Sequence, residues 1–206
     1  YGPIGSGALF EYISCFILFM NLLIIDVFDS FTYNLMHICE KYVKKVEVIR
    51  VDKINIDSIQ IYDKLIFSPG PGLPSDYPVL FQILQNYYQS KDILGICLGC
   101  QAIANYLGVN LLNLKNVMHG KKTLVKHFNN DKKLYKSIPN EFNVGRYHSW
   151  VVNNKKTKEL IVTSVDKFNN IMSFKHKKYK LRGIQYHPES ILTDYGKEII
   201  KNWINN

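Results

Sequence analysis

The stretch Asp92-Ile93-Leu94-Gly95-Ile96-Cys97-Leu98-Gly99-Cys100-Gln101 places a cysteine between a short apolar run and the start of a helical pattern. Residues 92–96 are typical of a buried strand. The apolar spacing from Leu98 to Leu107 predicts a helix that ends at Gly108. The sequence therefore predicts a strand, a sharp turn at Cys97 and a helix.

Two glycines, Gly95 and Gly99, flank Cys97 at two residues on each side. This G-x-C-x-G pattern is the cysteine form of a nucleophile elbow, in which small neighbours permit a tight strand-to-helix turn. The start of a helix also favours a thiolate, because its amides and dipole stabilise negative charge. Two alternatives remain at this point: a buried structural cysteine, and a redox pair formed with Cys100 in a C-x-x-C spacing.

Strand and helix patterns alternate from Met20 onward and predict an open, largely parallel, doubly wound α/β sheet with a smaller second half of mixed strands. We expect strands at 22–27, 46–51, 64–67 and 93–96, helices at 30–44 and 78–90, shorter strands at 123–128, 150–152, 160–165, 171–175 and 183–186, and a last helix at 194–204. In such sheets ligands bind at the carboxyl ends of strands, where Asp26, Ser68 and Cys97 are predicted to lie.

The composition is that of a globular protein. The chain has 206 residues, 47% hydrophobic and 21% charged, which favours a single domain at 20–206 preceded by an extension at 1–19. The net charge of +9 comes largely from dispersed Lys-Lys pairs without a nucleic-acid motif, so we expect no nucleic-acid partner. The apolar run before Met20 is too short to span a membrane, and four cysteines suit a reducing compartment, so we expect a cytoplasmic protein.

Ser68-Pro69-Gly70-Pro71-Gly72 follows the third predicted strand, next to the strand that ends at Cys97. Glycine lets the backbone approach a ligand closely, and proline stiffens the loop. We expect one amide of this loop and that of Leu98 to face a developing oxyanion. Pro71 has no N–H, so the loop donor is Gly70 or Gly72.

His187 and Glu189 lie two residues apart, directly after the last predicted strand. A cysteine nucleophile needs an imidazole to take and return its proton, and that imidazole needs a carboxylate to orient it. The spacing places both side chains on one side of an extended segment. We interpret this pair as the partners of Cys97 and take His37, His127 and His176 as structural.

Together, the elbow with Gln101 and the His187–Glu189 pair resemble the Cys-His-Glu triad of class I glutamine amidotransferases. Five further segments make the chain similar to the glutaminase component of anthranilate synthase, or of aminodeoxychorismate synthase: residues 29–35, 69–72, 118–121, 146–149 and 187–193. The resemblance covers about residues 20–206. It implies a flavodoxin-like fold in which Cys97, His187 and Glu189 are catalytic.

The resemblance also implies how the chain works. Cys97 would form a glutamyl thioester with L-glutamine, and the ammonia released would pass to a chorismate-binding synthase subunit in a hetero-oligomer. Residues implied to line the glutamine site are Gly70, Pro71, Gly72, Leu98, Gln101, Ser149 and Trp150. No metal or other cofactor is expected in this chain, and Mg²⁺ is expected only on the synthase subunit.

The chain departs from the family pattern in three places. Val27-Phe28 stands where Asn-Tyr is common, Cys100 stands where histidine is frequent, and Trp150 stands where leucine is frequent. We expect contacts at Trp150 to run through its backbone, and we expect Cys100 to place a second thiol near the nucleophile. A silent regulatory subunit with the same fold remains a further alternative.

Overall fold

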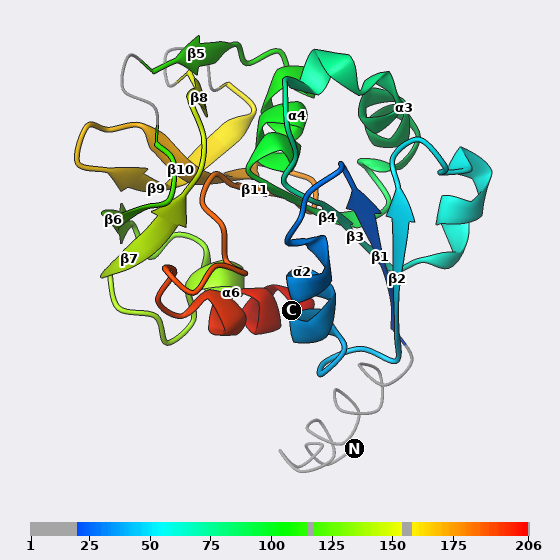
Figure 1. Ribbon diagram of the computed structural model, residues 1–206, viewed down its shortest axis with the longest axis horizontal. Helices are drawn as coiled ribbons and strands as arrows, with labels where there is room; N and C mark the ends of the chain where they lie inside the picture. The colour runs from blue at the N-terminus through cyan, green and yellow to red at the C-terminus, as the bar shows by residue number, and fades with distance from the viewer. Residues whose placement is uncertain (1–19, 115–117, 154–157, 206) are drawn as a thin grey trace, which may run out of the picture.

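The computed structural model describes residues 20–114, 118–153 and 158–205, so the predicted extension at 1–19 lies outside the described residues. In that part of the chain nine strands form one continuous sheet, in the order β2-β1-β3-β4-β11-β10-β9-β6-β7 (Figure 1). In this order the strands are Lys45–Arg50, Asn21–Asp26, Lys64–Phe67, Asp92–Ile96, Leu181–Ile184, Ile171–His176, Leu160–Asp166, Lys121–His127 and Glu141–Arg146.

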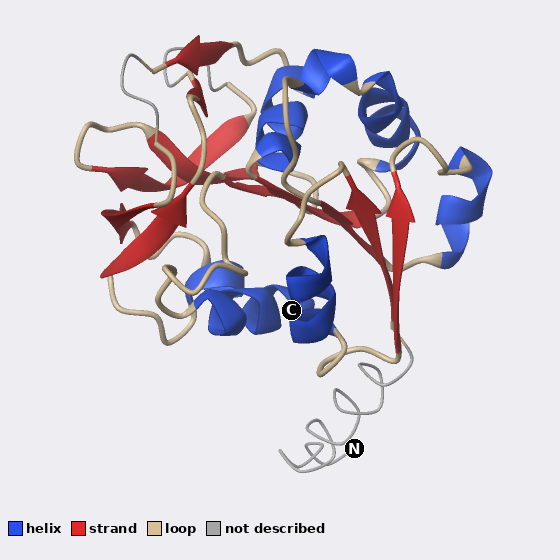
Figure 2. Cartoon of the chain, viewed as in Figure 1, coloured by secondary structure: helices blue, strands red, loops and turns tan. Residues whose placement is uncertain are grey.

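Helices cover both faces of the parallel part of this sheet (Figure 2). On one face lie α2 (Thr32–Cys39), α6 (Gly196–Ile204) and the short α5 (Lys132–Tyr135), and on the other lie α3 (Pro78–Tyr87) and α4 (Leu98–Tyr106). Two 3₁₀ helices, η1 (Ile56–Ile61) and η2 (Pro74–Asp76), and a small antiparallel sheet of β5 (Leu111–Asn113) and β8 (Trp150–Val152) complete the fold.

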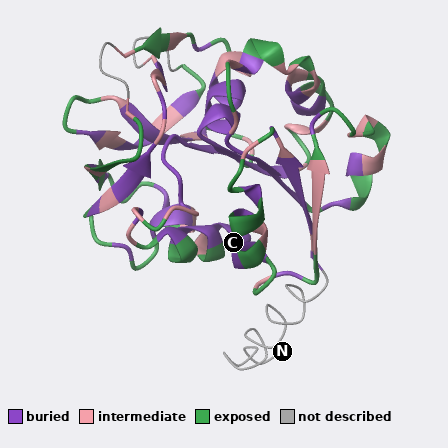
Figure 3. Cartoon of the chain, viewed as in Figure 1, coloured by how far each residue is buried: buried purple, intermediate pink, exposed green. Residues whose placement is uncertain are grey.

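Both faces of the central strands are buried (Figure 3). Along β1, Leu22 and Ile24 belong to the hydrophobic cluster beneath α2 and α6, while Leu23 and Ile25 belong to the cluster beneath α3 and α4. Alternating side chains of an extended strand point to opposite faces, so a strand covered on both sides is apolar throughout. This explains the continuous apolar run in the sequence.

The predicted fold class is confirmed, including the mixed strands of the second half. Strands β2, β1, β3, β4 and β11 are parallel, whereas β10, β9, β6 and β7 continue the same sheet as antiparallel neighbours. Of the mixed strands, β6, β7, β9 and β10 extend the main sheet, whereas β5 and β8 form the small separate sheet. Among the described residues no helix is long and apolar enough to cross a membrane.

Several predicted boundaries were wrong. The helix expected at 30–44 spans Thr32–Cys39, because the chain turns after Cys39 and the Lys44 amide donates to the Met20 carbonyl. The helix expected at 78–90 ends at Tyr87, and the last helix begins at Gly196. The strands β5 and β7 and the helix α5 were not predicted.

One pairing positions the functional residues. The last strand, β11, lies parallel to β4, with Ile184 opposite Ile96. The carboxyl ends of the two strands therefore coincide, and the segment after β11 lies beside the segment after β4. This brings His187, from the end of the chain, next to Cys97.

Candidate active site

Cys97 sits in a strained turn between β4 and α4. Its backbone has φ 49° and ψ −103°, in the region that side-chain-bearing residues rarely adopt, and its amide donates to the Ile184 carbonyl over 2.8 Å. Strain of this kind persists only where the surroundings impose it, and it is typical of a nucleophile held at an elbow. The side chain is 6% exposed.

The two flanking glycines make this turn possible. A Cβ on Gly95 would lie 2.3 Å from the Gly99 carbonyl oxygen, and a Cβ on Gly99 would lie 2.4 Å from that of Phe67. Both contacts are shorter than real Cβ atoms make, so α4 can start this close to β4 and β3 only with glycine at both positions. The predicted reason for the G-x-C-x-G pattern is therefore visible in the packing.

His187 and Glu189 form a buried pair beside the elbow. The Nδ1 atom of His187 lies 2.6 Å from Oε1 of Glu189, and their side chains are 6% and 1% exposed. The backbone is fixed by a hydrogen bond from the His187 amide to the Gly145 carbonyl. Thr193 Oγ1 adds a second anchor by donating to the His187 carbonyl while accepting from the Gly145 amide.

The other ring nitrogen, Nε2 of His187, is buried and has no hydrogen-bond partner within the described part of the chain. With Nδ1 donating to Glu189, this nitrogen is the one that can exchange a proton with a neighbour. Burial lowers the pKa of His187, but the negative charges of the Cys97 thiolate and Glu189 outweigh it and raise that pKa well above its usual value. The surroundings of His187 therefore favour its imidazolium form.

The Pro-Gly-Pro-Gly loop follows β3, the neighbour of β4. Gly70 is half-buried and packs against Val27, since a Cβ there would lie 2.3 Å from the Val27 carbonyl oxygen. Pro71 and Gly72 are exposed, and Gly72 has φ +75°. Ser68 anchors the loop by accepting from the Val27 amide over 2.8 Å.

The remaining predicted pocket residues come from α4 and from the segment around β8. Leu98 begins α4, where an amide has no acceptor within its own helix. Gln101, one turn later, donates from Nε2 to the Trp150 carbonyl over 2.9 Å. Ser149 accepts from the Leu114 amide through its own carbonyl. Trp150 thus meets Gln101 through its backbone.

Sequence reasoning missed Gln185. It is fully buried, lies two residues before His187 and donates from Nε2 to Sγ of Cys97 over 3.7 Å. Its two-residue spacing from His187 could have indicated the role, because this spacing places both side chains on the same side of an extended segment.

Tyr147 and His148 were quoted as part of a motif but given no role. The Tyr147 ring lies 4.8 Å from the His187 ring, nearly edge-on. His148 Nε2 accepts from Arg146 Nε over 3.1 Å, and burial together with the Arg146 charge lowers the pKa of His148 to about 3. His148 is therefore a neutral neighbour of the site.

Asp29, from the loop after β1, adds a further carboxyl group near the pair. Burial and the negative charge of Glu189 raise the pKa of Asp29. Its carboxylate accepts from the Phe31 amide, which orients the loop at the carboxyl end of β1. The segment around Asp29 thus lies close to His187 and Glu189, because the carboxyl ends of parallel strands lie at the same edge of the sheet.

Cys100 lies on the other side of the sheet from Cys97. Cys97 belongs to the cluster beneath α2 and α6, and Cys100 to the cluster beneath α3 and α4, where its Sγ packs against Gly183. Burial raises the pKa of Cys100 well above its usual value. A thiol kept protonated on the opposite face is poorly placed for exchange with Cys97, which argues against the redox alternative.

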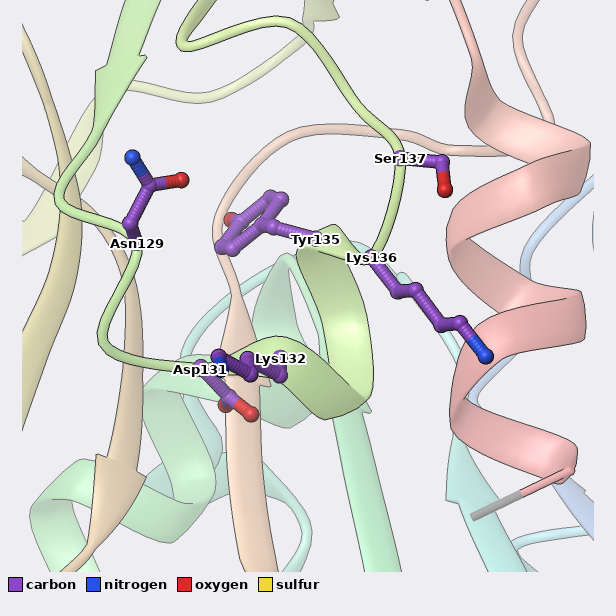
Figure 4. A pocket seen from close by; sticks show the side chains of 6 residues that line it. All are labelled: Asn129, Asp131, Lys132, Tyr135, Lys136 and Ser137. Carbon is purple, nitrogen blue, oxygen red and sulfur yellow. The ribbon is translucent and has the colours of Figure 1, made fainter.

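A cavity of about 270 Å³ lies beside α5, away from this site (Figure 4). Its lining is Asn129, Asp131, Lys132, Tyr135, Lys136 and Ser137. The buried polar groups there have partners inside the protein: Asp131 accepts from Arg182 Nε, and the Tyr135 hydroxyl donates to Ser173. Among the described residues no group of three or more His, Cys, Asp or Glu side chains is placed to hold a metal ion.

Comparison with known proteins decides the family. The family description "Glutamine amidotransferase class-I" matches residues 23–206. The chain belongs to the class I glutamine amidotransferases. Two crystal structures share this fold. A protein of Thermoplasma acidophilum has a TM-score of 0.80 and 22% sequence identity, with 90% of this chain and 92% of that chain covered. A glutamine amidotransferase of Thermotoga maritima has a TM-score of 0.68 and 18% identity, with 90% of this chain and 80% of that chain covered.

Relatives of this amidotransferase carry more specific names. It is 40% identical to anthranilate synthase component 2 of Pyropia yezoensis, over 89% of this chain and 98% of the relative. It is 32% identical to anthranilate synthase component 2 of Pseudomonas aeruginosa, over 89% and 94%. It is 34% identical to the aminodeoxychorismate/anthranilate synthase component 2 of Bacillus subtilis, over 89% and 95%.

Proposed function

We propose that this amidotransferase is the glutaminase component of an anthranilate synthase, and that it hydrolyses L-glutamine through a thioester on Cys97. One observation carries the proposal: the free, buried Nε2 of His187 beside Cys97, with Nδ1 held by Glu189 at 2.6 Å. A cysteine, a base with a raised pKa and an orienting carboxylate are the parts that acyl transfer requires.

In the first half of the reaction, the Cys97 thiolate attacks the side-chain carbonyl carbon of glutamine. A C–S bond forms, and the carbonyl electron pair moves to oxygen to give a tetrahedral oxyanion. The imidazolium of His187 then gives its proton to the amide nitrogen, the C–N bond breaks, and ammonia leaves. Glu189 keeps the ring in the orientation that both transfers need.

In the second half, neutral His187 takes a proton from water, and the oxygen of that water attacks the thioester carbon. The C–S bond breaks with release of glutamate, and the thiolate and imidazolium return. The Leu98 amide supports the oxyanion in both halves. For the second donor we favour Gly70, because it is half-buried against Val27, whereas the exposed Gly72 amide is open to water.

Gln101, Ser149, Trp150 and the loop of Gly70, Pro71 and Gly72 form the proposed glutamine pocket. The partner is a chorismate-binding synthase subunit, which receives the ammonia in a hetero-oligomer, and the names of the relatives support this assignment. We assign the amidotransferase domain to residues 20–206 and its location to the cytoplasm, where its thiols would stay reduced.

The test compares two nitrogen sources. The protein is mixed with a chorismate-binding synthase subunit, and anthranilate formation is followed by fluorescence with either glutamine or ammonium as the donor. We expect glutamine-dependent synthesis with release of one glutamate for each anthranilate formed. Synthesis from ammonium alone, with no glutamate released in the presence of glutamine, would favour a silent regulatory subunit and overturn the proposal.

A second candidate is the glutaminase component of aminodeoxychorismate synthase. The Bacillus subtilis relative, whose name includes both synthases, is the observation that favours it. The same assay with both types of synthase subunit separates the candidates by product. Aminodeoxychorismate alone would support the second candidate, and both products would indicate a shared subunit.

A further inference from the structure

Gln185 lies between the nucleophile and the glutamine pocket. Its side chain is fully buried, and its backbone is fixed by a hydrogen bond from its amide to the Met172 carbonyl of the neighbouring strand. The carboxamide has two polar ends, and each has a partner. Nε2 lies 3.7 Å from Sγ of Cys97, and Oε1 lies 3.3 Å from Nε2 of Gln101.

The orientation of this carboxamide follows from a backbone carbonyl. The Trp150 carbonyl can only accept, so the end of Gln101 that faces it over 2.9 Å must be the NH₂ group. The same NH₂ group faces Gln185, which must therefore present its oxygen. The NH₂ group of Gln185 is left to point at Cys97.

We propose that Gln185 is a positioning residue that donates an N–H to the Cys97 thiolate and holds it in line with the Trp150–Gln101 side of the pocket. A hydrogen bond to a charged acceptor is stronger than one to its neutral form, so this donor stabilises the thiolate over the thiol. The chain of contacts also fixes Gln101, so one buried amide orients both the nucleophile and a pocket residue. This role of Gln185 rests on the proposed function, because it concerns the same site.

Other charged or titratable groups act on the same thiolate. His187 lies beside it, with Glu189 behind the ring; Asp29 interacts with that pair, and His148 with His187. Cys100, on α4, interacts electrostatically with Cys97 and stays protonated. None of these groups is altered by replacing Gln185 with an uncharged residue of similar size, so such a variant isolates the contribution of the amide.

The test measures the rate at which iodoacetamide alkylates Cys97 across a range of pH, read by mass spectrometry of the Cys97 peptide. In Gln185→Met, which keeps the volume but removes the donor, we expect the pH profile of the rate to move up by about one unit, so that the rate on the rising part of the profile falls about tenfold. In Gln185→Glu, a negative charge beside the thiolate moves the profile further in the same direction.

A matched control is Thr163→Val, which removes another fully buried polar group from β9. Its alkylation profile should coincide with that of the parent. Circular dichroism and thermal melting establish that each variant is folded. An unchanged profile in both folded Gln185 variants would overturn the inference, as would an equal shift in Thr163→Val.

A glutaminase assay adds a second readout. Gln185→Met should lower kcat about tenfold and change KM for glutamine by less than about threefold, since Gln101 keeps its hydrogen bond to the Trp150 carbonyl. Gln101→Ala should instead raise KM. Because alkylation needs no glutamine, a parent protein without glutaminase activity in the presence of the synthase subunit would overturn the proposed function and leave the test of Gln185 intact.

Discussion

The parallel strands β3, β4 and β11 carry buried charged side chains at both of their ends, but the two sets differ in how they are paired. At the amino ends, Lys64 donates to Asp92 over 3.1 Å, and Asp92 also accepts from the indole of Trp203 over 3.0 Å. Arg182 donates to Asp131 over 3.0 Å, and its Nη1, without a hydrogen bond, lies 3.8 Å from Asp92.

At the carboxyl ends, the buried polar groups lie close together, but some of their atoms have no hydrogen-bond partner within the described residues. His187 uses one nitrogen for Glu189 and leaves the other free, and Glu189 leaves Oε2 unpaired. Both ends are buried, so burial of charge does not by itself mark a functional site. What distinguishes the carboxyl end is that Nε2 of His187, without a hydrogen-bond partner among the described residues, lies beside the strained Cys97, the proposed nucleophile. The amino end stabilises the fold by joining β3, β4 and α6, and we expect substitutions at the two ends to have opposite consequences.

The largest effect is expected at the carboxyl end. Cys97→Ala should lower glutamine-dependent product formation by at least about a thousandfold, because it removes the sulfur that forms the proposed thioester. Ammonia-dependent product formation by the complex should stay within about twofold of the parent. The thermal midpoint of the variant should stay within a few degrees of the parent. Paired assays with glutamine and ammonium measure the split. Equal loss in both would indicate damage to the fold or to the complex.

The next effect is expected at the amino end. Asp92→Ala leaves Lys64 and the Trp203 indole without their partner and should lower the free energy of unfolding by about 3–5 kcal/mol. Glutaminase activity per folded molecule should be unchanged. Chemical denaturation measures the loss, and Lys126→Ala, which breaks an exposed pair with Glu141, is the control at under about 1 kcal/mol. A greater loss of activity than of folded protein would break the distinction between the two ends.

The pH dependence should separate His187 from His148. The pKa of His187 is raised in the folded state, so its contribution to stability is fully present below about 6.5 and is lost as pH rises through the folded pKa. The pKa of His148 is lowered to about 3, so its contribution is present above about 6.5 and is lost as pH falls toward 3.

Nuclear magnetic resonance of histidine-labelled protein tests both directions. We expect the titration midpoint of His187 to lie above 6.5, while His148 is a neutral imidazole over the whole range from pH 5 to 8. Glu189→Gln removes a charge that supports the imidazolium and should lower the folded pKa of His187. Titration of both rings near 6.5 would contradict the electrostatic description of the site.

The smallest effect is expected at Cys100. Cys100→Ala should leave glutaminase activity and the alkylation rate of Cys97 within about twofold of the parent, because its thiol packs against Gly183 on the opposite face. Sensitivity of activity to mild oxidants should be unchanged as well. Protection of activity in this variant would restore the alternative of a disulfide between the two cysteines.

Much of the first half of the chain could be predicted from its sequence, because local patterns determine it. The strand at Lys64–Phe67 was predicted to the residue, and the elbow follows from the glycines around Cys97. The limits of α2 could not be read locally, because its end depends on a hydrogen bond between Lys44 and Met20. Boundaries of this kind depend on contacts that are distant in sequence or made by turns.

The second half and the supporting residues were harder to predict. The strand β7 alternates polar and apolar residues only over its first four positions, before Gly145 and Arg146, so its pairing with β6 is apparent only in the sheet. The contact between Gln185 and Cys97 joins residues 88 positions apart and depends on β11 pairing with β4. The triad positions were predicted because each follows a strand, whereas the role of Gln185 follows from the sheet order.

The proposed role of Cys97 as the nucleophile for glutamine can be tested by covalent trapping with a chloroketone analogue of glutamine, followed by peptide mass spectrometry. We expect one adduct per chain, on Cys97, that is prevented by excess glutamine, absent in Cys97→Ala and unchanged in Cys100→Ala. An adduct on Cys100, or labelling of Cys97 that glutamine does not compete away, would contradict the claim.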